Sequence, residues 1–419
     1  MKTYARYKDF GISWIGKIPE HWDVKRNKIF LDEQDDTVGS RFNDFDLLSL
    51  TKQGVILRDV ESGKGKFPKD FESYKIVKKG NMIFCLFDVD ETPRTVGLSA
   101  LDGMITGAYD VFSLRKIDAK FYSYFFIAVD DRKALRPLYT GLRKVVKKDR
   151  FLSYKIPVPP IEEQKSIANY LDKTTEKIRG LVAVKQKQIE LLKEYKQSLI
   201  ANAVTKGINP KAKMKDSGIN WIGMVPEHWN IHFLFQKAKE HYISNQNVHH
   251  QNLLSLSYGR IIQKDINTTE GLLPESFDTY QIVENENIVL RLTDLQNDHK
   301  SLRVGYVTQE GIITSAYECL EVMSGYSPKY LYYQLHSFDI RKMFYGMGGG
   351  LRQNLNYNEL KKIRIAVPPF EEQKAIVEYI ENRVSSIDVQ ISSIEKQITN
   401  LNEYKQSLIS DVVTGKVKV

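Results

Sequence analysis

Two stretches of the chain carry apolar residues at alternating spacings of three and four. Eight of eleven such positions are apolar from Ala168 to Ala203, and ten of eleven are apolar from Val377 to Val412. A mean spacing of about 3.5 residues is typical of a coiled coil, because so narrow an apolar stripe faces one partner helix. The pattern therefore predicts two long helices that pack against each other.

The predicted contact between the two helices is a seam of aliphatic residues. Its members are Leu171, Ile178, Val182, Ile189, Leu192, Leu199, Ile380, Val384, Ile387, Ile391, Ile394, Ile398, Leu401 and Leu408. The pattern leaves one alternative open, in which each helix packs only on the domain next to it.

Proline and glycine mark the ends of both predicted helices. Pro159-Pro160 and Pro368-Pro369 are unsuited to a helix interior but fit its first turn, and a Glu-Glu pair that follows each of them complements the helix dipole. Gly207 and Gly415 come after the last apolar positions, where a glycine commonly ends a helix. We therefore assign the helices to residues 159–207 and 367–415.

The stretches before the helices, residues 1–158 and 208–366, have a different pattern. Short apolar runs rich in β-branched and aromatic residues, such as Lys75-Ile76-Val77, are interrupted by Gly and Asn at short intervals. This pattern is typical of short strands joined by turns. It predicts a mostly β domain before each helix.

The chain contains one internal duplication of about 208 residues. Residues 9–22 (DFGISWIGKIPEHW) return as 216–229 (DSGINWIGMVPEHW), and 158–167 (VPPIEEQKSI) return as 367–376 (VPPFEEQKAI). A solenoid repeat has only about 20–50 residues, so each copy here is large enough to be a domain with an accessory element. Two copies predict a pseudo-two-fold body with two similar binding surfaces.

The order domain, helix, domain, helix suggests a simple two-fold arrangement. We expect an α+β fold with two pseudo-symmetric, mostly-β domains at opposite ends of an antiparallel two-helix coiled coil. Residues 168–203 would span roughly 50 Å at about 1.5 Å per residue. That length is about one and a half turns of B-DNA. The helices would then hold two binding surfaces at a fixed separation.

The charge of the chain is compatible with a polyanionic partner. There are 61 Lys and Arg against 52 Asp and Glu, a formal net charge of +9, which alone does not identify nucleic acid. Residues 1–209 hold 38 basic and 28 acidic residues, whereas residues 210–419 hold 23 and 24. If both halves bind DNA, the first half should contact phosphates more strongly and depend more steeply on salt.

Motifs of common catalytic and metal sites do not stand out in the sequence. Cys85 and Cys319 have neither zinc-site spacing nor the pattern of a disulfide framework, and no run of about 18 apolar residues indicates export or a membrane span. Residues 367–370 (VPPF) resemble the Asn-Pro-Pro-Phe motif of DNA amino-methyltransferases, but valine cannot accept a hydrogen bond from the target amino group. Residues 346–350 are glycine-rich without the form of a P-loop. We expect no catalytic residue and no metal site.

A glycine-led loop with basic or amide side chains recurs late in each copy. Gly141-Leu142-Arg143-Lys144 aligns with Gly350-Leu351-Arg352-Gln353. Glycine permits close approach to a phosphate, Arg binds a phosphate or the O6/N7 edge of guanine, and Asn or Gln suits adenine. The alternative is an exposed hairpin with solvated charges.

Further candidates lie where the two copies differ, because two different targets need different contacts. The candidate DNA-binding residues are Arg143, Lys144, Lys147, Lys148, Arg352, Gln353 and Asn354 in and after the loops, with Lys64, Lys66, Arg94, Arg291 and Arg303 elsewhere, and with Lys52 and Arg260 added to them.

On its repeated motifs the chain resembles the specificity subunit of type I restriction–modification enzymes. The resemblance rests on W-I-G-x-[IV]-P-E-H-W at 14–22 and 221–229, on the doubled V-P-P-[IF]-E-E-Q-K, and on the long helix after each copy. In that family each domain is a target-recognition domain that reads one half of a bipartite, asymmetric DNA site. The helices between them space the two halves.

The resemblance also implies partners and cofactors. Two methyltransferase subunits, which bind S-adenosylmethionine and methylate adenine, would dock on the helices. Restriction and motor subunits would complete an endonuclease that uses ATP and Mg. This chain would then be a non-catalytic, cytoplasmic subunit that binds double-stranded DNA and holds no cofactor of its own.

Two other hypotheses remain open. One is a coiled-coil adaptor whose domains bind proteins, which would show no salt-sensitive DNA binding with any partner. The other is a self-contained DNA-modifying enzyme, which methyl transfer or cleavage by the purified chain alone would favour.

Overall fold

A computed structural model describes residues 2–58, 71–140, 144–246, 250–267, 276–295, 302–347 and 354–419. The chain divides into two compact units, residues 1–186 with 395–419 (unit 1) and residues 187–394 (unit 2). Each unit contains one β-rich lobe and a segment of each of two long helices. Lobe 1 is the part of unit 1 that precedes the first long helix, and lobe 2 is the part of unit 2 between the two long helices.

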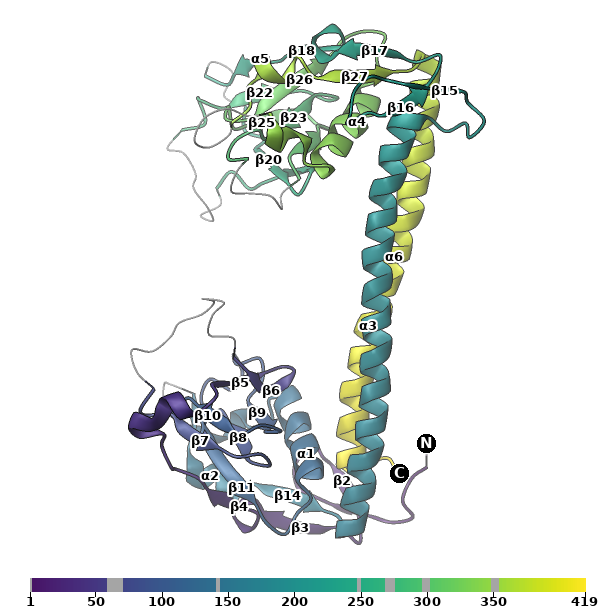
Figure 1. Cartoon of the computed structure of the whole chain (residues 1–419). Coiled ribbons are helices and arrows are strands. Elements are labelled where there is room, and N and C mark those ends of the chain that lie inside the picture. The colour runs from purple at the N-terminus through teal and green to yellow at the C-terminus, as the bar shows by residue number, and fades with distance from the viewer. Residues whose placement is uncertain are drawn as a thin grey trace. The chain divides into compact units, whose positions relative to one another are not determined.

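A four-stranded antiparallel sheet forms the centre of lobe 1. Its strands follow the order β4 (Leu31–Glu33), β11 (Asp110–Leu114), β8 (Met82–Phe84) and β9 (Val96–Leu98), and helix α1 (Ala119–Asp131) packs on it at β9 (Figure 1). Phenylalanines fill the core between sheet and helices, and Phe84, Phe112, Phe121, Phe125, Phe126 and Phe151 are at most 1% exposed. Such aromatic burial supplies much of the stabilisation of a domain.

The other elements of lobe 1 are short antiparallel pairs and single turns. The pairs are β1 (Tyr7–Asp9) with β2 (Lys17–Pro19), β3 (Asp23–Arg26) with β14 (Lys155–Val158), β5 (Leu48–Thr51) with β6 (Gly54–Leu57), β7 (Lys75–Val77) with β10 (Gly103–Ile105), and β12 (Tyr139–Thr140) with β13 (Val145–Val146). Helix α2 (Lys148–Ser153) precedes β14, and 3₁₀ turns lie at Asn27–Ile29, Gly39–Asp44 and Arg136–Leu138.

Lobe 2 repeats the plan of lobe 1. Its central sheet has the order β18 (Ala238–Glu240), β26 (Glu318–Val322), β23 (Ile288–Leu290) and β24 (Val304–Tyr306), with helix α4 (Pro328–Ile340) packed at β24. The repeated strand order confirms the expectation of two pseudo-symmetric α+β lobes.

Most of the remaining elements of lobe 2 follow the order of lobe 1, but β19 joins the counterpart of the β7–β10 pair, and the described part of lobe 2 has no counterpart of β12–β13. These elements are β15 (Met214–Asp216) with β16 (Met224–Pro226), β17 (Asn230–Phe233) with β27 (Arg364–Val367), β20 (Leu254–Ser257) with β21 (Arg260–Gln263), and β22 (Gln281–Val283) between β19 (Ile243–Ser244) and β25 (Gly311–Ile313). Helix α5 (Tyr357–Leu360) and 3₁₀ turns at Leu234–Gln236 and Met343–Gly346 complete the lobe.

The two long helices are α3 (Ile161–Lys206) and α6 (Phe370–Val413). All predicted seam residues are buried or half-buried, and Leu171 is fully buried. In unit 1, Leu171 of α3 shares a buried cluster with Leu408 of α6, and Lys185 Nζ lies 2.5 Å from Gln397 Oε1. Rising numbers on α3 therefore meet falling numbers on α6, so the two helices run antiparallel in unit 1.

The same antiparallel pairing occurs in unit 2. Lys196 Nζ lies 2.7 Å from Asp388 Oδ1, and a Cβ built on Gly207 would lie 3.3 Å from Glu372 Oε1. Lys185 and Lys196 occupy predicted seam positions, and each lysine reaches across to α6 rather than to its own lobe. These bonds contradict the alternative in which each helix contacts only the neighbouring domain.

In unit 1 the repeated motifs meet at the ends of the long helices. The buried indole of Trp22 donates from Nε1 to Glu163 Oε1 at 3.2 Å, and His21 Nε2 lies 2.9 Å from Glu163 Oε2. The end of α6 packs on the same turn, because a Cβ on Gly415 would lie only 2.2 Å from Pro19 Cδ. The Pro-Glu-His-Trp turn thus holds the start of one helix and the end of the other.

Unit 2 has a similar junction, but Trp229 Nε1 has no hydrogen-bond partner among the described residues. His228 Nε2 lies 2.7 Å from Glu372 Oε2 at the start of α6. Gly207, at the end of α3, has a φ of +72°, and a Cβ there would lie 3.2 Å from Trp229 Cζ2. The duplicated motifs are therefore explained by a duplicated contact, which fixes each lobe to both helices.

The glutamine of the repeated Glu-Glu-Gln segment links each long helix to the helix of its lobe. Gln164 Oε1 accepts from the backbone N–H of Asp118 at 2.8 Å, and Asp118 is the N-cap of α1. Gln373 Oε1 accepts in the same way from Ser327, the N-cap of α4, also at 2.8 Å. These bonds orient α1 and α4, and with them the sheets of the lobes, relative to the helix pair of their own unit.

Candidate nucleic-acid interface

The predicted loop of lobe 1 joins β12 to β13. Arg143 lies outside the described residues, as do Lys64 and Lys66. Lys144 has a φ of +50°, and its amine lies 2.6 Å from Glu91 Oε1 and 3.5 Å from Asp90 Oδ2. The hydrogen bond with Glu91 is the main reason that the pKa of Lys144 is raised. Lys144 is therefore charged, and it would have to leave these carboxylates to bind a phosphate.

The two lysines after this loop differ in whether they are free to bind a phosphate. Lys147 is exposed, whereas Lys148 forms ion pairs with Glu33 and Asp110. An exposed lysine without a bound carboxylate can approach a phosphate at little cost. Of these two candidates, Lys147 is the one placed to do so.

The corresponding loop of lobe 2 precedes α5. Arg352 and Gln353 lie outside the described residues. Asn354 is exposed, and its Oδ1 accepts a hydrogen bond at 2.9 Å from the backbone N–H of Asp294. Arg291, on the segment after β23, is half-buried, and its backbone N–H donates to Arg303 O at 2.8 Å. The amide of Asn354 thus links its loop to this segment and keeps its nitrogen for a further contact.

The structure contradicts the prediction that Arg303 contacts DNA. Its side chain is fully buried, and its guanidinium donates to Tyr345 Oη at 3.1 Å and to the carbonyls of Arg291 (3.1 Å), Thr293 (2.8 Å) and Asp294 (3.2 Å). A side chain without solvent contact cannot meet a duplex. Arg303 instead holds the chain segment after β23 in place.

Arg94 of lobe 1 is corrected for a similar reason. Its guanidinium lies 2.9 Å from Asp130 Oδ2 and 3.0 Å from Asp131 Oδ1, and only 16% of the side chain is exposed. Both carboxylates are at the end of α1, so the pairing fastens the segment before β9 to that helix. The charge of Arg94 is already neutralised inside the lobe, which leaves none for a phosphate.

Each lobe presents one β-hairpin with a firmly packed base, β5–β6 in lobe 1 and β20–β21 in lobe 2. A Cβ on Gly97 of β9 would lie 2.7 Å from Leu50 Cδ1 and 2.8 Å from Val55 Cγ2. In lobe 2 a Cβ on Gly305 of β24 would lie 2.6 Å from Leu256 Cδ1 and 2.8 Å from Ile261 Cδ1. Only glycine lets the hairpin lie this close to the sheet.

The tips of these hairpins differ between the lobes. In lobe 1 the exposed residues Lys52 and Gln53 connect the strands. In lobe 2 Tyr258 and Gly259 do so, and both have a positive φ, +46° and +77°. The side chain of Tyr258 is 79% exposed, and the neighbouring Arg260 is exposed as well. Tyr258 is not among the residues predicted from the sequence; the signal that could have found it is Gly259, because a glycine between two apolar runs marks a turn.

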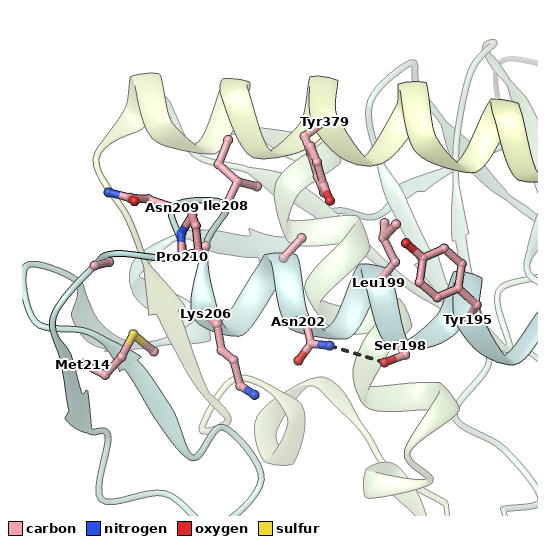
Figure 2. A pocket seen from close by; sticks show the side chains of 13 residues that line it. Tyr195, Ser198, Leu199, Asn202, Lys206, Ile208, Asn209, Pro210, Met214 and Tyr379 are labelled. Carbon is pink, nitrogen blue, oxygen red and sulfur yellow. Dashed lines mark hydrogen bonds between the residues drawn. The ribbon is translucent and has the colours of Figure 1, made fainter.

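A hollow of about 440 Å³ lies beside the C-terminal end of α3 in unit 2 (Figure 2). Its walls include Tyr195 and Leu199 of α3, Ile208 and Met214 of the chain that follows, and Tyr379 of α6. Tyr195 is 56% exposed, Ile208 38% and Tyr379 36%. The lining is mixed, because Ser198, Asn202, Lys206 and Asn209 border the hollow beside the apolar and aromatic side chains. Such a mixture of exposed apolar and polar groups is suited to protein contact.

The described residues show no constellation of a metal site. No three His, Cys, Asp or Glu side chains gather as ligands within them. Cys85 and Cys319 are both buried free thiols, and burial raises the pKa of each. Within the same described ranges, no helix is long and apolar enough to cross a membrane.

Comparison with known proteins assigns most of both copies to one family. The model of the type I restriction modification DNA specificity domain matches residues 69–191 and 266–400. The putative type I restriction enzyme MjaX specificity subunit of Methanocaldococcus jannaschii is 22% identical, and the match covers 99% of this chain and 98% of that protein. The MjaVIII specificity subunit of the same organism is 28% identical, with 67% of this chain and 66% of that protein covered.

Two solved structures share the fold. One is a chain from work on complex assembly and conformational transition of the type I R-M system, with a TM-score of 0.68, 13% identity, and coverage of 96% of this chain and 99% of that one. The other is the HsdS subunit from Thermoanaerobacter tengcongensis, with a TM-score of 0.51, 14% identity, and coverage of 96% and 98%.

Proposed function

Because this chain belongs to the type I restriction modification DNA specificity family, we propose that its two lobes recognise the two unlike halves of one bipartite DNA target. Its role is that of a DNA-recognition subunit, which is non-catalytic. We further propose that each lobe binds one half-site. Such a target is double-stranded DNA, and we place the chain with it in the cytoplasm.

The main observation behind this proposal is that the two lobes share one strand order but differ in the residues at their hairpin tips. Both lobes have the same strand order, and the hairpins rest on glycines at equivalent positions, Gly97 and Gly305. The exposed residues at the hairpin tips are different, Lys52 and Gln53 in one lobe and Tyr258 in the other. Sequence recognition requires this combination, since direct contact with base edges depends on a few side chains held by a rigid frame.

We also propose that the helix pair binds the partners of the complex. Tyr195 and Tyr379 lie beside the hollow in unit 2 (Figure 2), and both are partly exposed. Leu191, one turn before Tyr195 on α3, is 52% exposed. An amphipathic helix of another subunit could cover such a surface. The proposed partners are two methyltransferase subunits, with restriction and motor subunits added to them. S-adenosylmethionine, ATP and Mg would be bound by those subunits.

The test is co-expression of the chain with its methyltransferase partner in a host that lacks adenine methylation at the target. Single-molecule sequencing should reveal one bipartite motif with modified adenines and a fixed gap, and neither subunit alone should produce it. Methylation by the chain alone would instead favour a self-contained enzyme. If the complex formed but showed neither methylation nor salt-sensitive DNA binding, the protein-binding adaptor would be favoured.

A further inference from the structure

We propose that the β20–β21 hairpin of lobe 2 enters a groove of the DNA and that Tyr258 at its tip is a specificity-determining residue. The inference rests on the proposed function, because it assigns a contact within the half-site of lobe 2. Ser257 pairs with Arg260, so Tyr258 and Gly259 are the two central residues of a two-residue turn, and both have a positive φ.

A two-residue hairpin turn with two positive φ angles belongs to type I′, for which Asn-Gly is the preferred sequence. Gly259 satisfies the second position of this turn. Tyr258 does not suit the first, because an aromatic residue with a Cβ is strained in the left-handed region. Among the described residues, the other non-glycine residues with positive φ are Asp, Glu or Lys, and Tyr258 is the only aromatic one.

Packing does not account for the choice of tyrosine. The side chain of Tyr258 is 79% exposed, so little of the ring is buried. A residue that strains its turn and buries little of its surface contributes nothing visible to the fold of the free chain. Strain of this kind is commonly retained where it presents a side chain to a ligand.

The hairpin has the dimensions and the charge for a DNA groove. The major groove admits a two-stranded β-ribbon. Arg260 follows the tip and is exposed, and Lys264 is exposed directly after β21. Gly305 lets Leu256 and Ile261 pack closely on β24, and the buried Gly259 lies near Leu302, so the hairpin is held in place while the side chain of Tyr258 stays exposed. The basic side chains can contact phosphates while the tyrosine meets base edges.

The two hairpins are alike in their first strands and different at their tips, which independently supports the role of Tyr258. The first strands of the two hairpins are almost identical, LSLT in β5 and LSLS in β20, whereas the tips are Lys52-Gln53 and Tyr258-Gly259. Nearly identical first strands with different tips are expected if these strands are scaffold and the tips distinguish different bases. The hydroxyl of Tyr258 can exchange a hydrogen bond with a base edge, and its ring can pack on a thymine methyl group.

The experiment compares Tyr258→Ala, Tyr258→Phe and Tyr258→Asn in the full complex with the methyltransferase. Initial rates of methyl transfer are measured on the cognate duplex and on duplexes with one substituted base pair in either half-site. Tyr258→Ala should reduce discrimination by about ten-fold at one or two positions of one half-site, because it removes a direct contact with a base edge. The other half-site should be unaffected. Tyr258→Phe should separate the contribution of the hydroxyl from that of the ring.

Tyr258→Asn distinguishes recognition from a structural role. Asparagine suits the turn better than tyrosine, so this variant should melt at the same or a higher temperature and yet lose discrimination as Tyr258→Ala does. Tyr242→Ala, which removes another exposed tyrosine of lobe 2, is the matched control and should leave both half-sites unchanged. Lys52→Ala should alter the half-site that Tyr258 variants leave intact.

Unchanged discrimination in the three Tyr258 variants, with normal methylation by the wild-type complex, would overturn the inference and leave the proposed function intact. Loss of specificity at both half-sites together, or only in variants that melt at lower temperature, would also overturn it. If the wild-type complex itself modified no bipartite motif, the proposed function would fail first.

Discussion

Replacing Arg303 by alanine separates a structural arginine from one that binds DNA. In the structure its guanidinium is completely buried and donates to one hydroxyl and three backbone carbonyls. Alanine would leave those acceptors without their donor in a site that water does not reach. The expected effect is loss of stability in lobe 2, and any change in DNA recognition should be secondary to it.

The expected loss of stability follows from the hydrogen bonds of the buried guanidinium. A hydrogen bond to a charged group contributes about 1.5–3 kcal/mol, but such bonds are not additive when they share one donor group. Leaving a buried hydrogen-bonding group without its partner costs about 1–3 kcal/mol, and four acceptors lose their donor here. Each 1 kcal/mol lowers the melting temperature of a unit of about 200 residues by about 2–4 °C. We therefore expect Arg303→Ala to lower the melting temperature of unit 2 by about 10 °C.

Hydrogen exchange of the α4 amides provides the assay, because it reports on unit 2 without requiring the whole chain to unfold in one step. Arg260→Ala, which removes an exposed arginine of the same lobe, should leave exchange unchanged. The reasoning would be refuted if Arg303→Ala exchanged like the wild type while its complex methylated DNA with altered specificity in one half-site.

Three further predictions concern the helix ends, the helix surface and acid sensitivity. Gly415→Ala should destabilise unit 1 by at least about 1–2 kcal/mol from backbone strain alone, with more from the contact with Pro19. Gly180→Ala, in an open part of α3, should stabilise unit 1 by about 0.5–1 kcal/mol. Urea unfolding measures the stability of both variants, and an equal change in the two would contradict the packing at Gly415. Burial, aided by the charge of Lys196, lowers the pKa of His336 to about 4. The unfolded chain, with a pKa of about 6.5, therefore binds more protons as the pH falls from about 6.5 towards 4, and lobe 2 should lose about 3 kcal/mol over that window. His336→Ile should remove this part of the acid sensitivity in unfolding measured against pH, and an unchanged profile would refute the assignment.

The long helices could be predicted in detail from the sequence because their information is local. A repeat of 3.5 residues, prolines before the first turn and glycines after the last specify a helix and its seam without knowledge of the remote chain. The lysines at positions 185 and 196, which interrupt the apolar repeat, could not be interpreted in this way. Their roles depend on Gln397 and Asp388, which face them from the other helix.

The duplicated motifs were likewise visible in the sequence, but their purpose was not. Trp22 and Glu163 are 141 positions apart, and only the tertiary structure brings the Pro-Glu-His-Trp turn to the start of α3 and the end of α6. The same limit explains the errors over charged residues. Arg94 and Arg303 have the positive charge expected of DNA contacts. Carboxylates bind Arg94 and backbone carbonyls bind Arg303 inside their own lobes.

The sequence by itself determined the duplication, the two helices and the absence of familiar catalytic motifs, because periodicity and motif spacing are properties of nearby residues. Tertiary structure decided which basic side chains remain available to DNA and which side chains project from the surface. The burial of Arg303 depends on how distant strands pack, and the close contact of Gly305 with Leu256 and Ile261 holds the hairpin that carries Tyr258. No local pattern encodes that packing.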